Sequence, residues 1–309
     1  MANRFVRLPD TAGRRRLWIM YHVAFGLLLV HFLWVHLSPD YYYATQSDWS
    51  QAFAPIDQQQ RERVIERSDG RYLWGGDDES WHFDISEFRL DPAKLHHGIG
   101  RERFPALIEP RFDLLDQADD WLADDDRVLV LELGDEVRVY PIELLIRHEV
   151  VNDVVNDVPV FAAYCILADL GAVYDRRIAG HTFTFALSGY TYADPDIWDG
   201  MNMFILWDRE TESLWYPGTG RAVSGLMLYT PLPLIDHEHW SQTTWGRVKD
   251  RYDRAHVLRP GQDMDPPKDW PRLTAEDLAE AAAEQARAAR EDDPVHIAPR
   301  WGGNPDVGG

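Results

Sequence analysis

The chain has 309 residues, of which 45% are hydrophobic and 12% aromatic, which is enough to form one substantial core. Its formal net charge of -21 argues against a protein that binds nucleic acid by electrostatic attraction. The single cysteine, Cys165, excludes an intrachain disulfide, so cysteine usage does not indicate a compartment.

The N-terminal segment is typical of a membrane anchor. Residues 17–37 contain no Asp, Glu, Lys or Arg, and 21 residues span a hydrocarbon core of about 30 Å. Residues 1–16 carry five arginines against one aspartate, so the positive-inside rule predicts that they are cytoplasmic. The alternative, a cleaved signal peptide, requires a small-x-small cleavage site, and the following WVHLSPDYYY has none. We therefore expect a single-pass protein of the cytoplasmic (inner) membrane, with its N-terminus inside and its main domain extracytoplasmic.

Three histidines interrupt this apolar segment: His22, His31 and His36. Histidines within a membrane helix can ligate a haem in a helical bundle. One helix alone makes no such pocket, so we interpret them as polar contacts at the interface or between helices.

Residues 38–80 are polar and aromatic, and we interpret them as a connector with a short helix at 56–67. From residue 81 the pattern changes to short alternating strands. Turn-forming residues lie between four pairs of them, and predict β-hairpins around Gly134-Asp135, Asn156-Asp157, Ala179-Gly180 and 209–212. Short helices are expected at 142–147 and 240–252. Residues 81–260 are thus predicted to form one α+β domain of predominantly antiparallel β-hairpins.

The composition shifts again after residue 260. The run GQDMDPPKDWPR places a linker at 261–273. Thr274 can N-cap an alanine-rich helix over 274–291, in which acidic residues come first and arginines last, as the helix dipole favours. Residues 292–309 are rich in glycine and are predicted to be a disordered tail.

The strongest chemical constellation is His148-Glu149, followed by Asn152-Asp153 and then by Cys165. Imidazole, carboxylate and thiolate are all metal ligands, and a histidine with a cysteine also makes a base–nucleophile pair. The alternative is structural, because a lone cysteine on an apolar strand is usually part of the core and Asn-Asp pairs usually form turns.

Three weaker patterns are also present. An acidic loop suits calcium but lacks the spacing of an EF-hand: Asp194, Asp196, Asp199 and Asn202. His237 and His239 would point the same way on a strand, as a pair of metal ligands does. The adjacent pair His96-His97 is a second possible metal pair. Ser188 with His148 or His181 and Asp175 would make a hydrolase triad, but no local motif positions the serine. We interpret all three as structural or chance patterns.

Many separate motifs occur in one order: FPALIEPRF, VLELGDEVRVYPIELLIRHEVVND, VPVFAAYC, GAVYDRR, FTFALSG and NMFILWDRETESLW. In this order they resemble the bacterial and archaeal domain-of-unknown-function family 3179, over about residues 83–258. The resemblance implies an anchored or exported protein, and its usual Cys-Pro-Leu-Cys motif implies thiol redox chemistry or soft-metal binding. Here that motif reads Cys165-Ile166-Leu167-Ala168, so the second cysteine is absent, and one cysteine cannot cycle to an intrachain disulfide.

Two classes of function follow. The favoured one is a membrane-anchored accessory or binding subunit, with the membrane and a membrane protein as partners, since the second thiol is gone. The other is a metal-binding or thiol-redox protein in which Cys165 and His148 hold copper, zinc or iron. Its candidate pocket contains the matching polar residues His148, Glu149, Asn152, Asp153, Cys165, Asp175, Arg176 and Ser188. The sequence assigns no catalytic residue and leans against an enzyme.

Overall fold

The computed structural model describes residues 20–23, 26, 64–98, 100–262 and 269–279. Contacts divide the chain into one unit at 1–55 and a second at 56–309. In the first unit the described residues are helical. Most of the predicted membrane helix at 17–37 lies outside the described residues, as do residues 1–16 and the tail at 292–309. Within the described part of the chain, no helix has the length and apolar character needed to cross a membrane.

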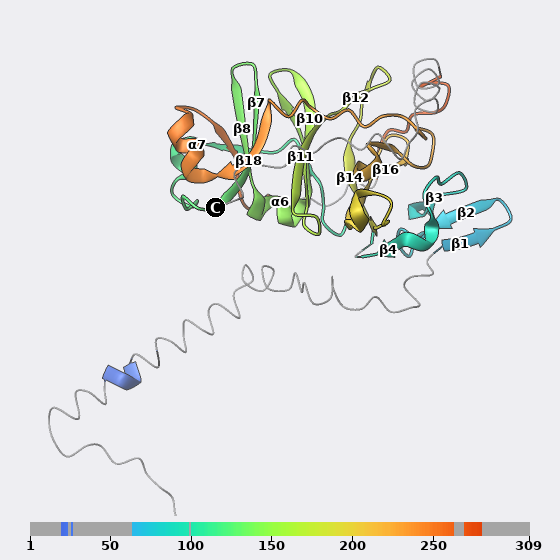
Figure 1. Cartoon of the computed structure of the whole chain (residues 1–309), viewed down its shortest axis with the longest axis horizontal. Coiled ribbons are helices and arrows are strands. Elements are labelled where there is room, and N and C mark those ends of the chain that lie inside the picture. Colours follow the sequence, from blue (N-terminus) through green and yellow to red (C-terminus); the bar gives the residue numbers. More distant parts are fainter. Residues whose placement is uncertain (1–19, 24–25, 27–63, 99, 263–268, 280–309) are drawn as a thin grey trace, which may run out of the picture. The chain divides into compact units, whose positions relative to one another are not determined.

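The second unit is built mainly of β-sheets, with few helices, as predicted (Figure 1). One five-stranded sheet has the order β18-β7-β8-β19-β6. Its strands are β6 (Phe112–Leu114), β7 (Arg127–Leu133), β8 (Glu136–Pro141), β18 (Trp240–Thr244) and β19 (His256–Leu258). Helices α5 (Leu115–Ala118) and α7 (Trp245–Arg251) pack with this sheet.

A four-stranded sheet has the order β11-β10-β9-β5. Its strands are β5 (Leu107–Ile108), β9 (Val150–Val155), β10 (Val158–Cys165) and β11 (Leu170–Asp175). Helix α6 (Ile142–His148) connects β8 to β9. The pairs β5–β9 and β8–β19 are parallel, so the sheets are mixed rather than wholly antiparallel.

The second five-stranded sheet has the order β17-β16-β15-β14-β4. Its strands are β4 (Leu95–His97), β14 (Phe185–Tyr192), β15 (Met203–Asp208), β16 (Leu214–Tyr216) and β17 (Arg221–Ala222). Two small sheets complete the unit. They comprise β1 (Val64–Arg67), β2 (Gly70–Leu73) and β3 (Phe83–Asp84), and the pair β12 (Arg177–Ile178) and β13 (His181–Thr182).

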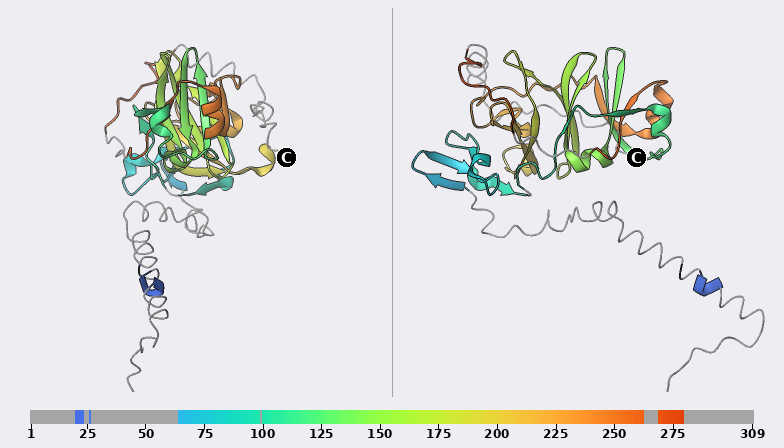
Figure 2. Two further views of the ribbon diagram at one scale, coloured as in Figure 1. Left: turned by 90° about the vertical axis from the view of Figure 1, so that its left-hand side faces the viewer. Right: turned by 180° about the vertical axis from the view of Figure 1, so that it is seen from behind.

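Strand β10 shows how the sequence makes these layers. Phe161, Ala163 and Cys165 pack into the core shared with β14–β16, whereas Val160, Ala162 and Tyr164 pack into the core shared with β7 and β8. Successive side chains of a strand point to opposite faces, so a strand buried on both faces must be apolar throughout. The run VPVFAAYC meets that requirement and lies in the middle layer (Figures 1 and 2).

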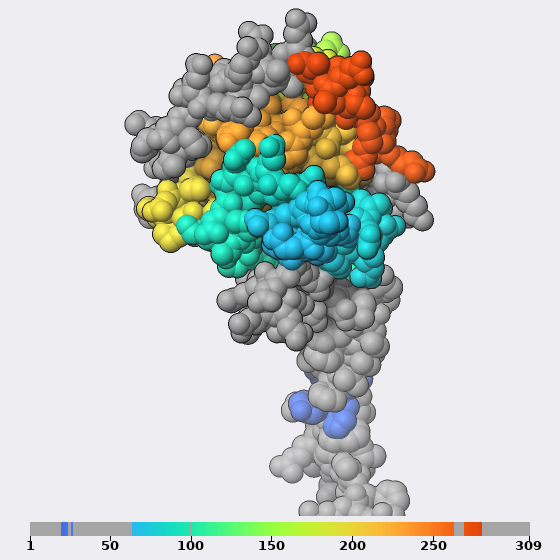
Figure 3. Space-filling view, turned by 90° about the vertical axis from the view of Figure 1, so that its right-hand side faces the viewer, coloured from blue at the N-terminus to red at the C-terminus, as the bar shows by residue number. Residues whose placement is uncertain are grey.

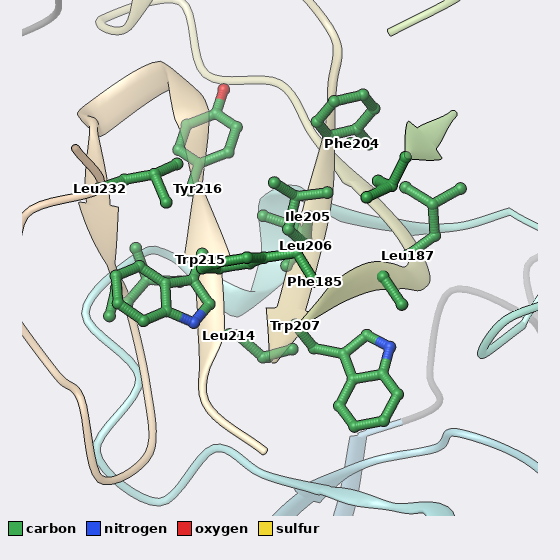
Figure 4. Packing of buried hydrophobic residues seen from close by; sticks show 14 of the residues in the cluster. Phe185, Leu187, Phe204, Ile205, Leu206, Trp207, Leu214, Trp215, Tyr216 and Leu232 are labelled. Atoms are coloured by element: carbon green, nitrogen blue, oxygen red, sulfur yellow. The ribbon is translucent and has the colours of Figure 1, made fainter. Parts of the chain in front are cut away.

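The core beside β14–β16 is aromatic. Phe161 stacks on Phe185 with ring centroids 4.3 Å apart, and Trp215 meets Phe185 edge-on at 5.5 Å. Figure 4 shows Trp215, Tyr216 and Trp207 projecting from neighbouring strands around this cluster. Such pairs add about 0.5–1.5 kcal/mol each beyond their area burial.

All four predicted hairpins are confirmed, as β7–β8, β9–β10, β12–β13 and β15–β16. The predicted helix at 142–147 is α6. Two helix predictions are wrong in part. Residues 64–67 of the predicted helix at 56–67 form strand β1, and 56–63 lie outside the described residues. In 240–252 the first five residues form β18, because their alternating side chains pair with β7 before α7 begins.

The predicted linker at 261–273 is wrong over its described C-terminal part. The Trp270 Nε1–H donates to Glu210 Oε1 at 2.8 Å, and the Leu273 backbone N–H donates to the Glu210 carbonyl at 2.8 Å. Figure 3 shows residues 269–279, coloured red, against the orange and gold surface. Thr274 and Asp277 exchange hydrogen bonds like a helix cap, but the described residues that follow, 275–279, form turns, and 280–291 lie outside the described part.

Candidate functional site

The end of helix α6 positions the first candidate residues. The backbone of Glu149 is left-handed, with φ 55°, and its N–H donates to the Leu145 carbonyl at 2.6 Å, which caps the helix. The chain then turns into β9, and the Glu149 carbonyl accepts from the Tyr164 N–H at 2.9 Å. This bond brings the His148-Glu149 pair beside the end of β10, where Cys165 lies.

Cys165 is a buried thiol with 4% of its surface exposed. Burial, together with the nearby Glu149 carboxyl, raises the pKa of the thiol to about 12, although backbone N–H groups of Ala168, Phe204 and Leu167 oppose the shift. A cavity of about 10 Å³, near the space that one water molecule needs, borders the sulfur, and its other lining residues are mostly apolar. The thiol is therefore protonated at neutral pH.

The Glu149 carboxyl completes a buried pair with this thiol. Burial raises the pKa of Glu149 to about 8, and a hydrogen bond from the Ile166 backbone N–H only partly offsets the increase. At pH 7 both members of the pair are mostly neutral. A neutral carboxyl beside a neutral thiol can hold a proton, but it does not supply the charge that activates a thiolate.

His148 lies at the last position of α6 and is mostly buried. Its Nδ1 lies 2.9 Å from the Pro105 carbonyl oxygen. A carbonyl oxygen only accepts, so Nδ1 carries the proton and donates it, which anchors the ring to the segment before β5.

Asn152, Asp153 and Arg176 are used in bonds that join the sheets. The Asn152 side chain donates to the carbonyls of Leu107 and Phe185 and accepts from the Phe185 N–H at 2.9 Å. Asp153 accepts from the Tyr140 hydroxyl at 2.8 Å, and burial raises its pKa. Arg176 donates to the carbonyls of Phe183 and Asp153. These three residues hold β9 against its neighbours.

Asp175 and Ser188 stabilise a turn and a β-bulge, respectively. Asp175 pairs with Arg177 at 2.5 Å in the turn after β11. The Ser188 hydroxyl donates to the Ile205 carbonyl at 2.6 Å and accepts from the Tyr190 N–H, inside a bulge of β14. The sequence resemblance grouped them with Cys165, but the contacts that the structure gives them are with other residues.

The donors around Cys165 do not make a three-ligand metal site. Among the described residues, no three His, Cys, Asp or Glu side chains are close enough to hold a metal ion. In the acidic loop, Asp194 forms an ion pair with Lys94 at 2.6 Å. His237 lies 3.2 Å from its neighbour Asp236 on the surface.

Sequence reasoning missed a dense charge network on the β15–β16 hairpin. Arg209, which is 2% exposed, pairs with Glu102 at 2.6 Å, and Arg101 pairs with Glu212 at 2.6 Å. Burial raises the pKa of Asp208 to about 7, although Trp215 Nε1–H donates to its carboxyl at 2.8 Å. The concentration of charge in WDRETES was the available signal, since a charged run between two apolar strands is unusual if it is buried.

A groove beside this network was also missed. It has a volume of about 480 Å³, which falls in the range of small-molecule sites, roughly 300–1,000 Å³. The described residues lining it come from two segments, 74–81 and 100–103. The tryptophans Trp74 and Trp81 gave no specific signal in a chain that contains 13 of them.

The fold and these two sites define an α+β domain of mixed sheets, with a buried thiol–carboxyl pair in its core and an open groove at its N-terminal end. The chain belongs to the family described as protein of unknown function (DUF3179), whose model matches residues 101–271. The family resemblance expected from the sequence is thereby confirmed. No curated protein matches the chain, and no solved structure matches it.

Proposed function

We propose that this protein is a membrane-anchored, extracytoplasmic binding or accessory subunit. In this proposal, residues 17–37 anchor the chain in the cytoplasmic membrane with the N-terminus inside. Cys165 serves the core rather than a reaction, and the groove lined by 74–81 and 100–103 serves binding. The absence of Asp, Glu, Lys and Arg from 17–37 and the arginines before it support the anchor.

One observation carries the binding role over a thiol role. Cys165 is buried among mostly apolar side chains, and its pKa is raised to about 12 by burial and by Glu149. Reactive thiols have a lowered pKa and lie in partly exposed, electropositive surroundings, whereas this thiol has neither property. The groove, by contrast, is open and of suitable size for a ligand.

A second candidate function, thiol chemistry at Cys165, is favoured by a different observation. Hydrogen bonds from the backbone N–H groups of Ala168, Phe204 and Leu167 lower the pKa of the thiol, because such donors stabilise a thiolate. If β10 opened locally, the same donors would face a thiolate that water had begun to solvate. This candidate requires a thiol that reacts in the native protein.

Thiol accessibility separates the two. We expect native protein at pH 8 to react with an aromatic disulfide reagent at least about a hundredfold more slowly than the urea-unfolded chain, because buried, protonated thiols are inert. Elemental analysis of protein purified without chelator should show no stoichiometric copper, zinc or iron in the wild type, Cys165→Ala or His148→Ala. A rapidly reacting native thiol, or a metal lost in both variants, would replace the binding proposal with the second candidate.

Membrane attachment has its own test. Full-length protein should stay with the membrane pellet after alkaline carbonate extraction, whereas a chain starting at residue 38 should be released. Replacing Leu27 and Leu28 by arginine should also release the chain, since each charge at a helix centre costs about 2.5–3.5 kcal/mol of insertion free energy. Release of the full-length wild type would contradict the anchor.

A further inference from the structure

The groove at the N-terminal end of the second unit contains an exposed tryptophan. Trp81 is the last residue of a short 3-10 helix that Asp78 caps at its N-terminus. It has 44% of its surface exposed. A side chain at Gly76 would place its Cβ 2.9 Å from the Trp81 ring, so the indole lies directly on that glycine. At Gly75 a Cβ would lie 1.8 Å from the Trp81 carbonyl oxygen. Two glycines therefore let Trp81 pack closely on the backbone while 44% of its surface stays exposed.

Hydrogen bonds hold the backbone of this segment in place. The Trp81 carbonyl accepts from Arg101 Nη1 at 3.0 Å, and the Arg101 backbone N–H donates to the Gly75 carbonyl at 3.3 Å. The Arg101 guanidinium lies 3.7 Å from the centroid of the Trp207 ring. The backbone of Trp81 is thus connected to the buried charge network, which limits the movement of the segment that carries the ring.

Two exposed carboxylates at the edge of the groove can supply the counter-charge for a cation. They are Asp77 and Asp78, whereas the next residue, Glu79, pairs with Arg67 at 3.5 Å. The Asp78 carboxyl accepts from the Ser80 N–H and hydroxyl, which lowers its pKa and keeps it ionised. Two basic residues also line the groove: Arg101, which pairs with Glu212 at 2.6 Å, and Arg103, which is exposed. The net charge of -21 adds a negative field to the whole chain.

We propose that this groove binds a small organic cation of the quaternary ammonium type, with Trp81 and Trp74 contacting the cationic head and Asp77 and Asp78 balancing its charge. Aromatic faces attract such cations through the ring quadrupole, and tryptophan does so best. This inference deepens the proposed binding function and rests on it.

The test uses choline and its uncharged isostere, 3,3-dimethylbutan-1-ol, titrated into the full-length protein in detergent. The readouts are calorimetry and tryptophan fluorescence. We expect saturable choline binding, and binding of the isostere at least about tenfold weaker, since the isostere keeps the shape but loses the charge. Trp81→Ala should weaken choline binding about fivefold or more, and Asp77→Asn about threefold or more, each without a change in the melting temperature.

Matched controls are available in the chain. Leu114→Ala removes another exposed apolar side chain, and Asp135→Asn removes a charge from the turn between β7 and β8; neither should change the affinity. Trp81→Phe keeps an aromatic face and should retain most of the binding if Trp81→Ala proves unstable.

The inference would be overturned if the isostere bound as tightly as choline. It would also be overturned if no choline bound at concentrations up to about 10 mM. If choline fails while Cys165 stays unreactive in the native protein, the cation inference is wrong and the proposed binding function stands. A reactive native Cys165 would instead remove the proposed function itself.

Discussion

Glu149 is a carboxyl group whose surroundings favour its neutral form. It is buried at the end of α6, beside the Cys165 thiol. Its carboxyl accepts a hydrogen bond from the Ile166 backbone N–H. Burial raises its pKa to about 8, against an ordinary value near 4.5. The folded protein therefore binds this proton more tightly than the unfolded chain does, and stability depends on pH.

The sign of that dependence follows directly. Because the folded pKa is raised, the stability is fully present below pH 4.5 and is lost as pH rises toward 8. Each pH unit inside this window corresponds to about 1.4 kcal/mol for one proton, so Glu149 should lower the free energy of unfolding by about 2–3 kcal/mol between pH 5 and pH 7. Urea unfolding at several pH values measures this change.

Glu149→Gln should remove that part of the slope, because glutamine has a similar shape and no charge. Glu143→Gln is the matched control. It lies on the same helix, is exposed and pairs weakly with Arg147 at 3.9 Å, so it should leave the slope unchanged. An unchanged slope in Glu149→Gln would show that the carboxyl is solvated in the native protein.

At the scale of single elements, the bulge in β14 fixes the approach of two distant segments. The register shifts between Leu187 and Tyr190, and Gly189 at its centre has φ 81°. The Gly98 N–H donates to the Gly189 carbonyl at 2.9 Å. A Cβ on Gly189 would lie 2.1 Å from the carbonyl carbon of Gly100, so backbone lies against backbone here.

Gly189→Ala should therefore destabilise the protein strongly. The positive φ costs about 1–2 kcal/mol and the backbone overlap about 1–3 kcal/mol more, or roughly 3 kcal/mol in total. Gly180→Ala is the matched control, because φ is 78° and nothing lies within 4 Å of the added Cβ. It should cost only about 1–2 kcal/mol, from the positive φ. Equal losses in urea unfolding would show that the Gly100 segment moves away.

The sequence could predict which neighbouring strands pair, but not which distant strands pair. The four hairpins were predictable because their turns, such as Asn156-Asp157, and their strands are neighbours in the chain. The pairing of β14 with β4, or of β18 with β7, joins residues about a hundred positions apart, and no local pattern carries that information. The helix predicted at 56–67 was wrong over 64–67 because β1 is stabilised by β2 and not by its own helical propensity.

The candidate site was predictable only in part, for a similar reason. The sequence placed Glu149 in one candidate pocket with His148 and Cys165, and the structure brings the Glu149 carboxyl near the thiol because helix α6 ends beside the end of β10. It could not show that Ser188 bonds to Ile205, because that contact depends on the bulge. Nor could it show that Trp81 packs on Gly75 and Gly76, because that contact depends on how residues 74–81 fold.

At the scale of the whole molecule, residues 269–279 belong to the folded unit. Arg272 Nη1 donates to the Arg209 carbonyl at 2.7 Å, and its other nitrogen pairs with Glu212 at 2.7 Å. Leu278 is 3% exposed and joins the aromatic core beside β14–β16. The segment therefore covers the same hairpin whose Glu212 holds Arg101 at the groove.

A chain that ends at residue 262 should consequently be less stable than one that ends at 279. Burying one leucine contributes about 1.5–3 kcal/mol, and each of the hydrogen bonds about 1 kcal/mol. Since the burial of Leu278 alone is of this size, we expect the truncation at 262 to lower the free energy of unfolding by about 2 kcal/mol. The free energy of unfolding in urea, compared between the two truncated chains, measures it.

Point variants in the full-length chain locate this effect. Leu278→Ala should cost about 2 kcal/mol, whereas Leu226→Ala, at a leucine that is 41% exposed, should cost less than about 0.5 kcal/mol. Because Glu212 contacts both Arg272 and Arg101, the chain ending at 262 should also bind choline more weakly than the chain ending at 279. Equal stability of the two truncated chains would mean that the hairpin holds Glu212 without help, and the domain would then end where β19 does.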